Sequence, residues 1–131
     1  SVVLLDIDHF KLVNDRYGHG CGDLVLRRFA EEARRIVRGC DALGRWGGEE
    51  FLLLMPETAL ESACVGAERL RQMLEGLLIE SGGETLQVTL SAGVAQIDGA
   101  ESIEMLVERA DRALYAAKAQ GRNRVRCTAA A

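Results

Sequence analysis

Acidic side chains occur at two places where they could together hold a metal ion. Asp6 and Asp8 end the first apolar run, and Glu49 and Glu50 directly follow the pair Gly47–Gly48. Because side chains alternate between the two faces of a strand, one acid from each place could converge above the edge of a sheet. Converging carboxylates repel one another unless a cation lies between them, and Mg²⁺ is typically held by one or two carboxylates together with phosphate oxygens. The alternative is that these acids are solvated at strand ends, with Asp8 capping the helix that follows.

The pair Gly47–Gly48 lies between two extended runs, at residues 42–46 and 49–55, and this arrangement is a strong signal for a β-hairpin. The primed turns of two-residue hairpins need positive φ angles, which glycine adopts freely. Because neither glycine carries a side chain, a ligand can approach the backbone of the turn closely. The hairpin therefore favours the interpretation of its two glutamates as part of a binding site.

The elements that position these acids follow from the spacing of apolar residues. The run at 2–7 is largely aliphatic, as in a strand that is buried on both faces. Amphipathic spacing predicts helices at 9–17, from 23 to about 37, at 58–78, and from the N-cap Ser102 to Gly121. Further strands are predicted at 42–46, 49–55, 86–97 and around Val125. Gly39, Gly82–Gly83 and Gly121 are expected to end the three long helices.

This order of elements mixes a hairpin with crossovers and predicts an α+β fold, in which one mixed central β-sheet is flanked by helices. The length of 131 residues is that of a single domain, 1–131. A content of 48% hydrophobic and 27% charged residues excludes disorder. We expect no membrane contact by this domain, because no apolar run approaches the roughly 20 residues of a membrane helix. We also expect no nucleic-acid binding, because the net charge is −4.

The four cysteines, at positions 21, 40, 64 and 127, form no Cys-x-x-Cys pair and no Cys/His cluster, which argues against a zinc site. Their even number alone is weak support for disulfides. We therefore expect four reduced thiols and a cytoplasmic location, although the protein that contains the domain could be tethered to a membrane.

Three separated motifs stand out in the sequence. The first is Arg-Trp-Gly-Gly-Glu-Glu-Phe at 45–51. The second combines Asp-Ile-Asp-His-Phe-Lys at 6–11 with Asn14-Asp15, Gly18-His19 and Gly22-Asp23. The third is Ala-Asp-Arg-Ala-Leu-Tyr-Ala-Ala-Lys at 110–118, followed by Gly121-Arg122-Asn123. Together they resemble the motifs of the GGDEF family of diguanylate cyclases, with the first similar to the signature loop of the family in its GGEEF form. Because family members usually begin with an upstream helix, we expect 1–131 to be a domain truncated at its N-terminus, without that helix and the regulatory region.

The resemblance implies a palm-like fold of the nucleotide-cyclase type, with the hairpin turn at the active site. Family members join two GTP molecules into cyclic di-GMP and release two pyrophosphates. By similarity, Asp6, the carbonyl of Ile7, Glu49 and Glu50 would hold Mg²⁺, with two ions per active site and Mn²⁺ as a possible substitute. Glu49 and Glu50 are the implied catalytic residues, and for Glu49 the roles of metal ligand and of base are both open.

By the same resemblance, Asn14 and Asp23 bind the guanine of GTP. A carboxylate accepts hydrogen bonds from the N1–H and N2–H₂ groups of guanine, which adenine lacks, so such a site discriminates against ATP. Asp23 can also be the N-cap of its helix, and Asn14 taken alone could be a solvated helix residue. His19, Gly47 and Gly48 lie where the nucleotide would approach.

The implied contacts to the β- and γ-phosphates are cationic. Lys118 and Arg122 lie four residues apart at the end of the last helix, and Lys11 would add a third cation. The alternative for Lys118 is a favourable interaction with the dipole of its helix alone.

Arg38 and Asp41 match the R-x-x-D site at which many family members bind their product as an inhibitor. Arginine binds guanine O6 and N7 through two hydrogen bonds and stacks on bases, which suits a cyclic dinucleotide. The alternative is an arginine at the end of a helix beside an aspartate at the start of a strand. Arg69, on the following helix, is implied as a second contact to the product.

One such domain carries one GTP, so the resemblance implies that turnover requires a homodimer whose domains face each other in antiparallel fashion. The alternative function is a non-catalytic receptor that binds GTP or cyclic di-GMP and signals to a partner. The presence of Asp6, Glu49, Lys118 and Arg122 favours the enzyme, because a receptor has no need of metal ligands.

Overall fold

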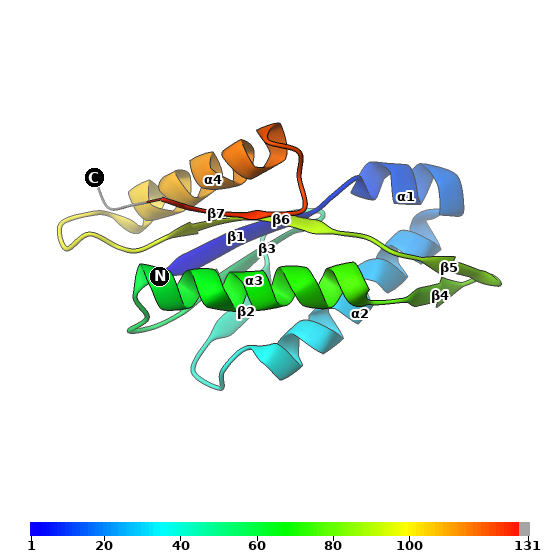
Figure 1. Cartoon of the computed structure of the whole chain (residues 1–131), viewed down its shortest axis with the longest axis horizontal. Helices are drawn as coiled ribbons and strands as arrows, with labels where there is room; N and C mark the ends of the chain where they lie inside the picture. Colours follow the sequence, from blue (N-terminus) through cyan, green and yellow to red (C-terminus); the bar gives the residue numbers. More distant parts are fainter. Residues whose placement is uncertain (129–131) are drawn as a thin grey trace.

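The computed structural model describes residues 1–128. Its helices and strands are, in chain order, β1 (Val2–Ile7), α1 (Phe10–Tyr17), α2 (His19–Ile36), β2 (Ala42–Arg45), β3 (Glu50–Leu54), α3 (Leu60–Gly76), β4 (Ile79–Ser81), β5 (Glu84–Leu86), β6 (Leu90–Ala95), α4 (Ile103–Ala119) and β7 (Val125–Thr128). Five strands form one sheet in the order β2-β3-β1-β6-β7. Helix α4 covers one face of this sheet, and α2 and α3 cover the other (Figure 1). The predicted α+β fold with a mixed central sheet is confirmed.

Strand β1 lies at the centre of the sheet and pairs antiparallel with both β3 and β6. All six of its residues are buried, as predicted. Strands β6 and β7 are parallel, and α4 is the crossover helix that connects them. Because Leu90 at the start of β6 pairs with Ile7 at the end of β1, the chain returns from α4 to the end of the sheet where β1 ends.

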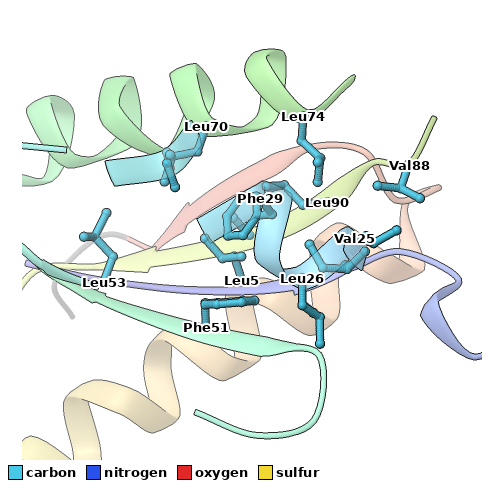
Figure 2. Close-up of a cluster of buried hydrophobic side chains, with 14 of the residues drawn as sticks. Leu5, Val25, Leu26, Phe29, Phe51, Leu53, Leu70, Leu74, Val88 and Leu90 are labelled. Carbon is cyan, nitrogen blue, oxygen red and sulfur yellow. The ribbon is translucent and has the colours of Figure 1, made fainter. Parts of the chain in front are cut away.

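Two clusters of buried apolar side chains hold the helices on the sheet. On one face, Leu70 and Leu74 point from α3 toward the sheet (Figure 2). Phe29 of α2 packs on Phe51 of β3 in the same cluster, with ring centroids 5.0 Å apart in an edge-to-face arrangement. On the other face, a smaller cluster joins β1 and β6 to α4; it contains Val2, Leu4, Ala95, Leu106, Ala110 and Leu114. The alternation of side chains along β1 divides its residues between the two clusters.

The segment after α3 differs from the prediction of a helix to residue 78 and one long strand at 86–97. Helix α3 ends at Gly76, and β4 and β5 form a separate two-stranded hairpin at one end of the molecule (Figure 1). Gly82 and Gly83, with φ angles of 57° and 82°, form the turn of this hairpin and do not end a helix. Strands of three residues are too short to show an apolar period, so the glycine pair was the only signal.

Helix α2 also differs from the prediction at both ends. It begins at His19, with Gly18 as its N-cap residue at φ 91°, so Asp23 lies inside the helix and is not an N-cap. Its last residue is Ile36, and its C-cap residue Val37 has an extended backbone, so Gly39 is not the residue that ends the helix.

Helix α4 begins where the sequence predicts. Ser102 is the N-cap of α4, as predicted, and its hydroxyl oxygen accepts a hydrogen bond of 3.2 Å from the N–H of Met105. None of the helices within residues 1–128 is long and apolar enough to cross a membrane.

The expectation of four reduced thiols is wrong for one pair. Cys64 of α3 and Cys127 of β7 form a disulfide, whereas Cys21 and Cys40 are free. The sequence separation of 63 between Cys64 and Cys127 gave no sign of their proximity. The two cysteines meet because α3 runs across the sheet beside its last strand, which only the tertiary structure reveals.

The packing of α4 on β6 depends on the small size of Gly93. A Cβ atom at this position would lie 2.1 Å from the carbonyl oxygen of Ala110 and 2.3 Å from the nitrogen of Leu114. We expect Gly93→Ala to lower the free energy of unfolding, measured by urea denaturation, by about 1–3 kcal/mol because the helix must move away. Gly44→Ala in β2, where nothing lies within 4 Å of the added atom, is the matched control. Equal stability of the two variants would contradict this account.

Candidate active site

The acids predicted to converge lie on adjacent strands. Asp6 of β1 is directly opposite Glu50, the first residue of β3, in the antiparallel register. Residues that face each other in this way have their side chains on the same side of the sheet, so the predicted convergence is confirmed. Glu49 precedes β3, and its carbonyl accepts a hydrogen bond of 3.2 Å from the N–H of Ile7. A Cβ atom at Gly47 would lie 3.0 Å from Glu50 Oε2, which shows that this carboxylate lies against the hairpin turn.

The carboxylate of Asp6 is only partly compensated. Lys118 of α4 forms an ion pair with its Oδ2, while Oδ1 is buried and accepts no hydrogen bond from residues 1–128. Burial raises the pKa of the Asp6 carboxyl above its ordinary value, against the opposing effect of Lys118. Burial also raises the pKa of Glu50, and the charge of Asp6 adds to the shift. The surroundings of the Asp6 and Glu50 carboxylates therefore favour the binding of additional positive charge.

The turn between β2 and β3 is longer than predicted. The N–H of Trp46 donates to the carbonyl of Glu50 at 2.8 Å, which leaves residues 47–49 in the turn. Neither glycine of the turn has a positive φ angle, so the predicted two-residue primed turn is wrong. Instead, Arg45 closes the turn, because its Nε and Nη2 atoms donate to the carbonyl of Gly48 at 2.9 and 2.6 Å.

An open pocket of about 490 Å³ lies between α1, α2 and this turn. It is lined by residues that were predicted to bind substrate or metal, namely Lys11, Asn14, His19, Asp23, Gly48 and Glu49. Phe10, Leu26 and Arg45 also line it and were not predicted as site residues. The pocket thus combines hydrogen-bonding groups with an apolar wall, as a planar heterocyclic base requires.

The position of Asn14 depends on a close approach between α1 and α2. A Cβ atom at Gly22 would lie 1.9 Å from Asn14 Oδ1 and 3.1 Å from Cζ of Phe10. The missing side chain at Gly22 therefore makes room for the amide of Asn14 over the first turns of α2. The helices predicted at 9–17 and from residue 23 left Gly22 in the loop between them, so the sequence did not indicate this role.

Of the two cations predicted at the end of α4, only Lys118 contacts a predicted acid. Arg122 is exposed in the turn before β7, with a φ angle of 64°. Asp8 is not a helix cap, because its carboxylate accepts hydrogen bonds of 2.7 Å from Thr89 Oγ1 and from Ser91 Oγ. The N-cap position of α1 is held by His9, whose side chain makes no capping hydrogen bond.

A second pocket, of about 270 Å³, is lined by all three residues predicted to bind product, Arg38, Asp41 and Arg69. Nη2 of Arg38 donates to Asp41 Oδ1 at 3.0 Å, and the same guanidinium contacts Thr58 Oγ1. Burial alone would raise the pKa of Asp41, but the hydrogen bonds from Arg38 hold it below its ordinary value. Asp41 and Thr58 thus fix the direction of a guanidinium group at the edge of this pocket.

Comparison with known proteins finds relatives over nearly the whole chain. Residues 1–124 match the family model described as diguanylate cyclase, GGDEF domain. The diguanylate cyclase DgcP of Pseudomonas aeruginosa is 46% identical over 124 residues, which are 95% of this chain and 18% of that protein. The chain spans between 18% and 34% of the length of the first curated relatives that it matches.

Two solved structures share the fold. The diguanylate cyclase SiaD from Pseudomonas aeruginosa, in complex with its activator SiaC, has a TM-score of 0.94 and 43% identity and covers 97% of this chain and 49% of that chain. The GGDEF domain of DgcB from Caulobacter crescentus, in complex with c-di-GMP, has a TM-score of 0.92 and 37% identity. That match covers 96% of this chain and 75% of that chain.

The contact between Gly22 and Asn14 is testable by substitution. We expect Gly22→Ala to weaken binding of a non-hydrolysable GTP analogue by about tenfold or more, because the added methyl group displaces the amide of Asn14 and leaves a polar group of the base unpaired. Isothermal titration calorimetry is the measurement. Gly20→Ala, in the same turns of α2 with nothing within 4 Å of the added atom, is the control. The same affinity for both variants would contradict the role given to Gly22.

Proposed function

The chain belongs to the GGDEF family of diguanylate cyclases, and we propose that it condenses two molecules of GTP into cyclic di-GMP with release of two pyrophosphates. The observation that carries this proposal is one pocket that joins Asn14 and Asp23 to Glu49, next to the pair of Asp6 and Glu50. Residues suited to hold a guanine thus adjoin carboxylates suited to hold the metal of a triphosphate.

The base is assigned to the part of the pocket between α1 and α2. The carboxylate of Asp23 accepts from N1–H and N2–H₂ of guanine, and the amide of Asn14 adds a further hydrogen bond. Adenine offers neither of these donors to the Asp23 carboxylate, so the pocket favours GTP over ATP. His19 and Gly48 border the same pocket and line the approach of the nucleotide.

Residues at the end of β1 fit a divalent cation, on which GGDEF diguanylate cyclases generally depend. Asp6 Oδ1 is a buried acceptor without a donor in residues 1–128, and the charges of Glu49 and Glu50 both interact with Asp6. The described residues hold no ready-made cluster of three ligand side chains. Mg²⁺ takes few carboxylates and completes its shell with phosphate oxygens and water.

We assign Asp6, the carbonyl of Ile7, Glu49 and Glu50 as ligands of two Mg²⁺ ions, for which Mn²⁺ is a substitute. When bound, such ions polarise the phosphate oxygens and neutralise the charge that develops on the departing pyrophosphate. We assign Lys118, which contacts Asp6 from α4, to the terminal phosphates of the nucleotide. Arg122 and Lys11 are the further cations that we assign to these phosphates.

In the reaction, the 3′-oxygen of one GTP forms a bond to the α-phosphorus of the other, and the bond from that phosphorus to pyrophosphate breaks. The 3′-hydroxyl loses its proton, and Glu49 is the carboxylate that we assign to accept it while it also serves as a metal ligand. The domain offers one guanine pocket, so two chains must face each other in an antiparallel homodimer. The protein otherwise contributes by orienting the two nucleotides and by compensating charge.

Replacing Glu49 tests the catalytic assignment. We expect Glu49→Ala, in a chain fused to a dimeric coiled coil, to lower the rate of pyrophosphate release from GTP and Mg²⁺ by about a hundredfold or more, because a charge-compensating group is lost. Glu80→Ala, in the exposed and separate β4–β5 hairpin, is the control with unchanged rate.

Undiminished product formation by Glu49→Ala would refute the role of the turn. A dimeric wild-type fusion that binds GTP with Mg²⁺ but releases no pyrophosphate would instead support a non-catalytic receptor.

We also propose that the second pocket binds cyclic di-GMP and that this binding inhibits the enzyme. Support comes from the guanidinium of Arg38, which Asp41 holds in place, and from Arg69 on the same pocket. The nucleotide has two guanine bases, which suit two arginines through hydrogen bonds to O6 and N7 and through stacking.

We expect Arg38→Ala to weaken binding of cyclic di-GMP by about tenfold or more, because a charged hydrogen-bonding group is removed, and to leave the initial rate of GTP turnover unchanged. Arg35→Ala is the control, since Arg35 is an exposed residue near the end of α2, three positions before Arg38, and its ion pair within residues 1–128 is a 3.7 Å contact with Glu32. Product affinity equal to that of the control variant would remove the inhibitory-site proposal.

A further inference from the structure

A hydrogen-bond network outside the pockets ties α3 to the turn between α4 and β7. Nη1 of Arg71, on α3, donates to Asn123 Oδ1 at 2.8 Å. The same guanidinium forms ion pairs with Glu68 at 2.6 Å and with Glu75 at 3.3 Å, and Nδ2 of Asn123 donates to Glu75. The side chain of Arg71 is only 14% exposed. A largely buried cation is thus held by two acids and directed at a single residue of the turn.

A second set of contacts anchors the same turn to the end of β1. The backbone N–H of Asn123 donates to Asp8 Oδ2 at 3.0 Å. Asp8 is buried, and its carboxylate is fixed by the hydroxyls of Thr89 and Ser91. Because Asp8 follows Asp6 by two residues, the turn is joined through one carboxylate to the segment that carries the proposed metal ligand.

Arg122 lies inside this anchored turn. Gly121, Arg122 and Asn123 have φ angles of 118°, 64° and 47°. Positive φ is unusual for residues with a side chain, and it persists where the surrounding contacts determine it, often at functional sites. Here those contacts are the bonds of Asn123 and a hydrogen bond of 3.0 Å from the N–H of Arg122 to the carbonyl of Ala117. The guanidinium of Arg122 itself projects from an exposed position.

We propose that Arg71 and Asn123 are positioning residues that fix Arg122 at a defined place relative to Asp6, so that its guanidinium meets the phosphates of the nucleotide. Both act through the backbone of the turn: Arg71 holds the side chain of Asn123, and Asn123 is bonded to Asp8. This proposal rests on the proposed function, in which Arg122 binds the β- and γ-phosphates.

A purely structural role of the network makes a different prediction. Loss of packing between α3 and the turn would lower the stability of the fold and would affect all ligands alike. A positioning role affects only ligands that carry phosphates, and it has no further effect once Arg122 is absent. The two roles therefore differ in how the effects of two substitutions combine.

The test is a double-mutant cycle of Arg71→Gln and Arg122→Ala, measured as binding of guanosine 5′-[α,β-methylene]triphosphate, whose α–β bond is not cleaved, and of guanosine, each with Mg²⁺. We expect Arg71→Gln to weaken binding of the triphosphate by about tenfold and to leave guanosine binding within about twofold. In the Arg122→Ala background, Arg71→Gln should cause no further loss. Arg112→Gln, which removes an exposed arginine with only an i,i+4 pair to Glu108, is the matched control.

Additive losses, equal losses for both ligands, or no loss with Arg71→Gln would each overturn the positioning role. If Arg122→Ala itself leaves triphosphate binding unchanged, the phosphate contact in the proposed function is wrong and the positioning proposal fails with it. Thermal unfolding monitors the fold of every variant. If Arg71→Gln does not fold, Asn123→Gly replaces it, because glycine keeps the positive φ and the N–H toward Asp8 but loses the contact with Arg71. The same selective loss is then expected, and its absence would overturn the proposal.

Discussion

The crowding of carboxylates where β1 meets β3 is the constraint on which the rest of the site depends. The register places Asp6 opposite Glu50, and burial raises the pKa of both groups. Buried charges of one sign are costly unless cations compensate them. The fold supplies one cation itself, because the crossover through α4 returns the chain to this end of the sheet and delivers Lys118 to Asp6. The negative charge that Lys118 does not compensate makes this site suited to a metal ion bound to a triphosphate.

Much of the fold was predictable because long elements carry strong apolar periods. The buried strand β1 and the capped helix α4 are examples. The errors occurred where glycines were the only signal. The glycines at 20 and 22 suggested a loop, although packing of α1 on α2 holds them in a helix, and Gly82–Gly83 turned out to be a hairpin turn. The disulfide between Cys64 and Cys127 was not predictable, since it depends on how α3 crosses the sheet.

For the candidate site, the sequence patterns identified the residues that could bind a ligand, but not the contacts that hold those residues in position. The resemblance named Asn14, Asp23 and Glu49, and the structure places all three on one pocket. It did not indicate that Arg45 closes the turn or that Asp8 is bonded to β6. Such supporting contacts join residues that are far apart in the sequence, and no local spacing encodes them. Their residue types are also ambiguous, because a buried aspartate that organises a loop looks the same in sequence as one that binds a cation.

The connection between β6 and α4, at residues 96–102, lies at the other end of the sheet, because Ala95 pairs with Val2 at the start of β1. Arg109 braces this connection through hydrogen bonds of 2.6 Å to both carboxylate oxygens of Glu101. Its tip, at Gly99 and Ala100, is exposed. A fluorophore or an inserted peptide attached there would be separated from the pocket at Asn14 and Glu49 by the length of the strands, so the molecule has a natural attachment point for a reporter of that pocket.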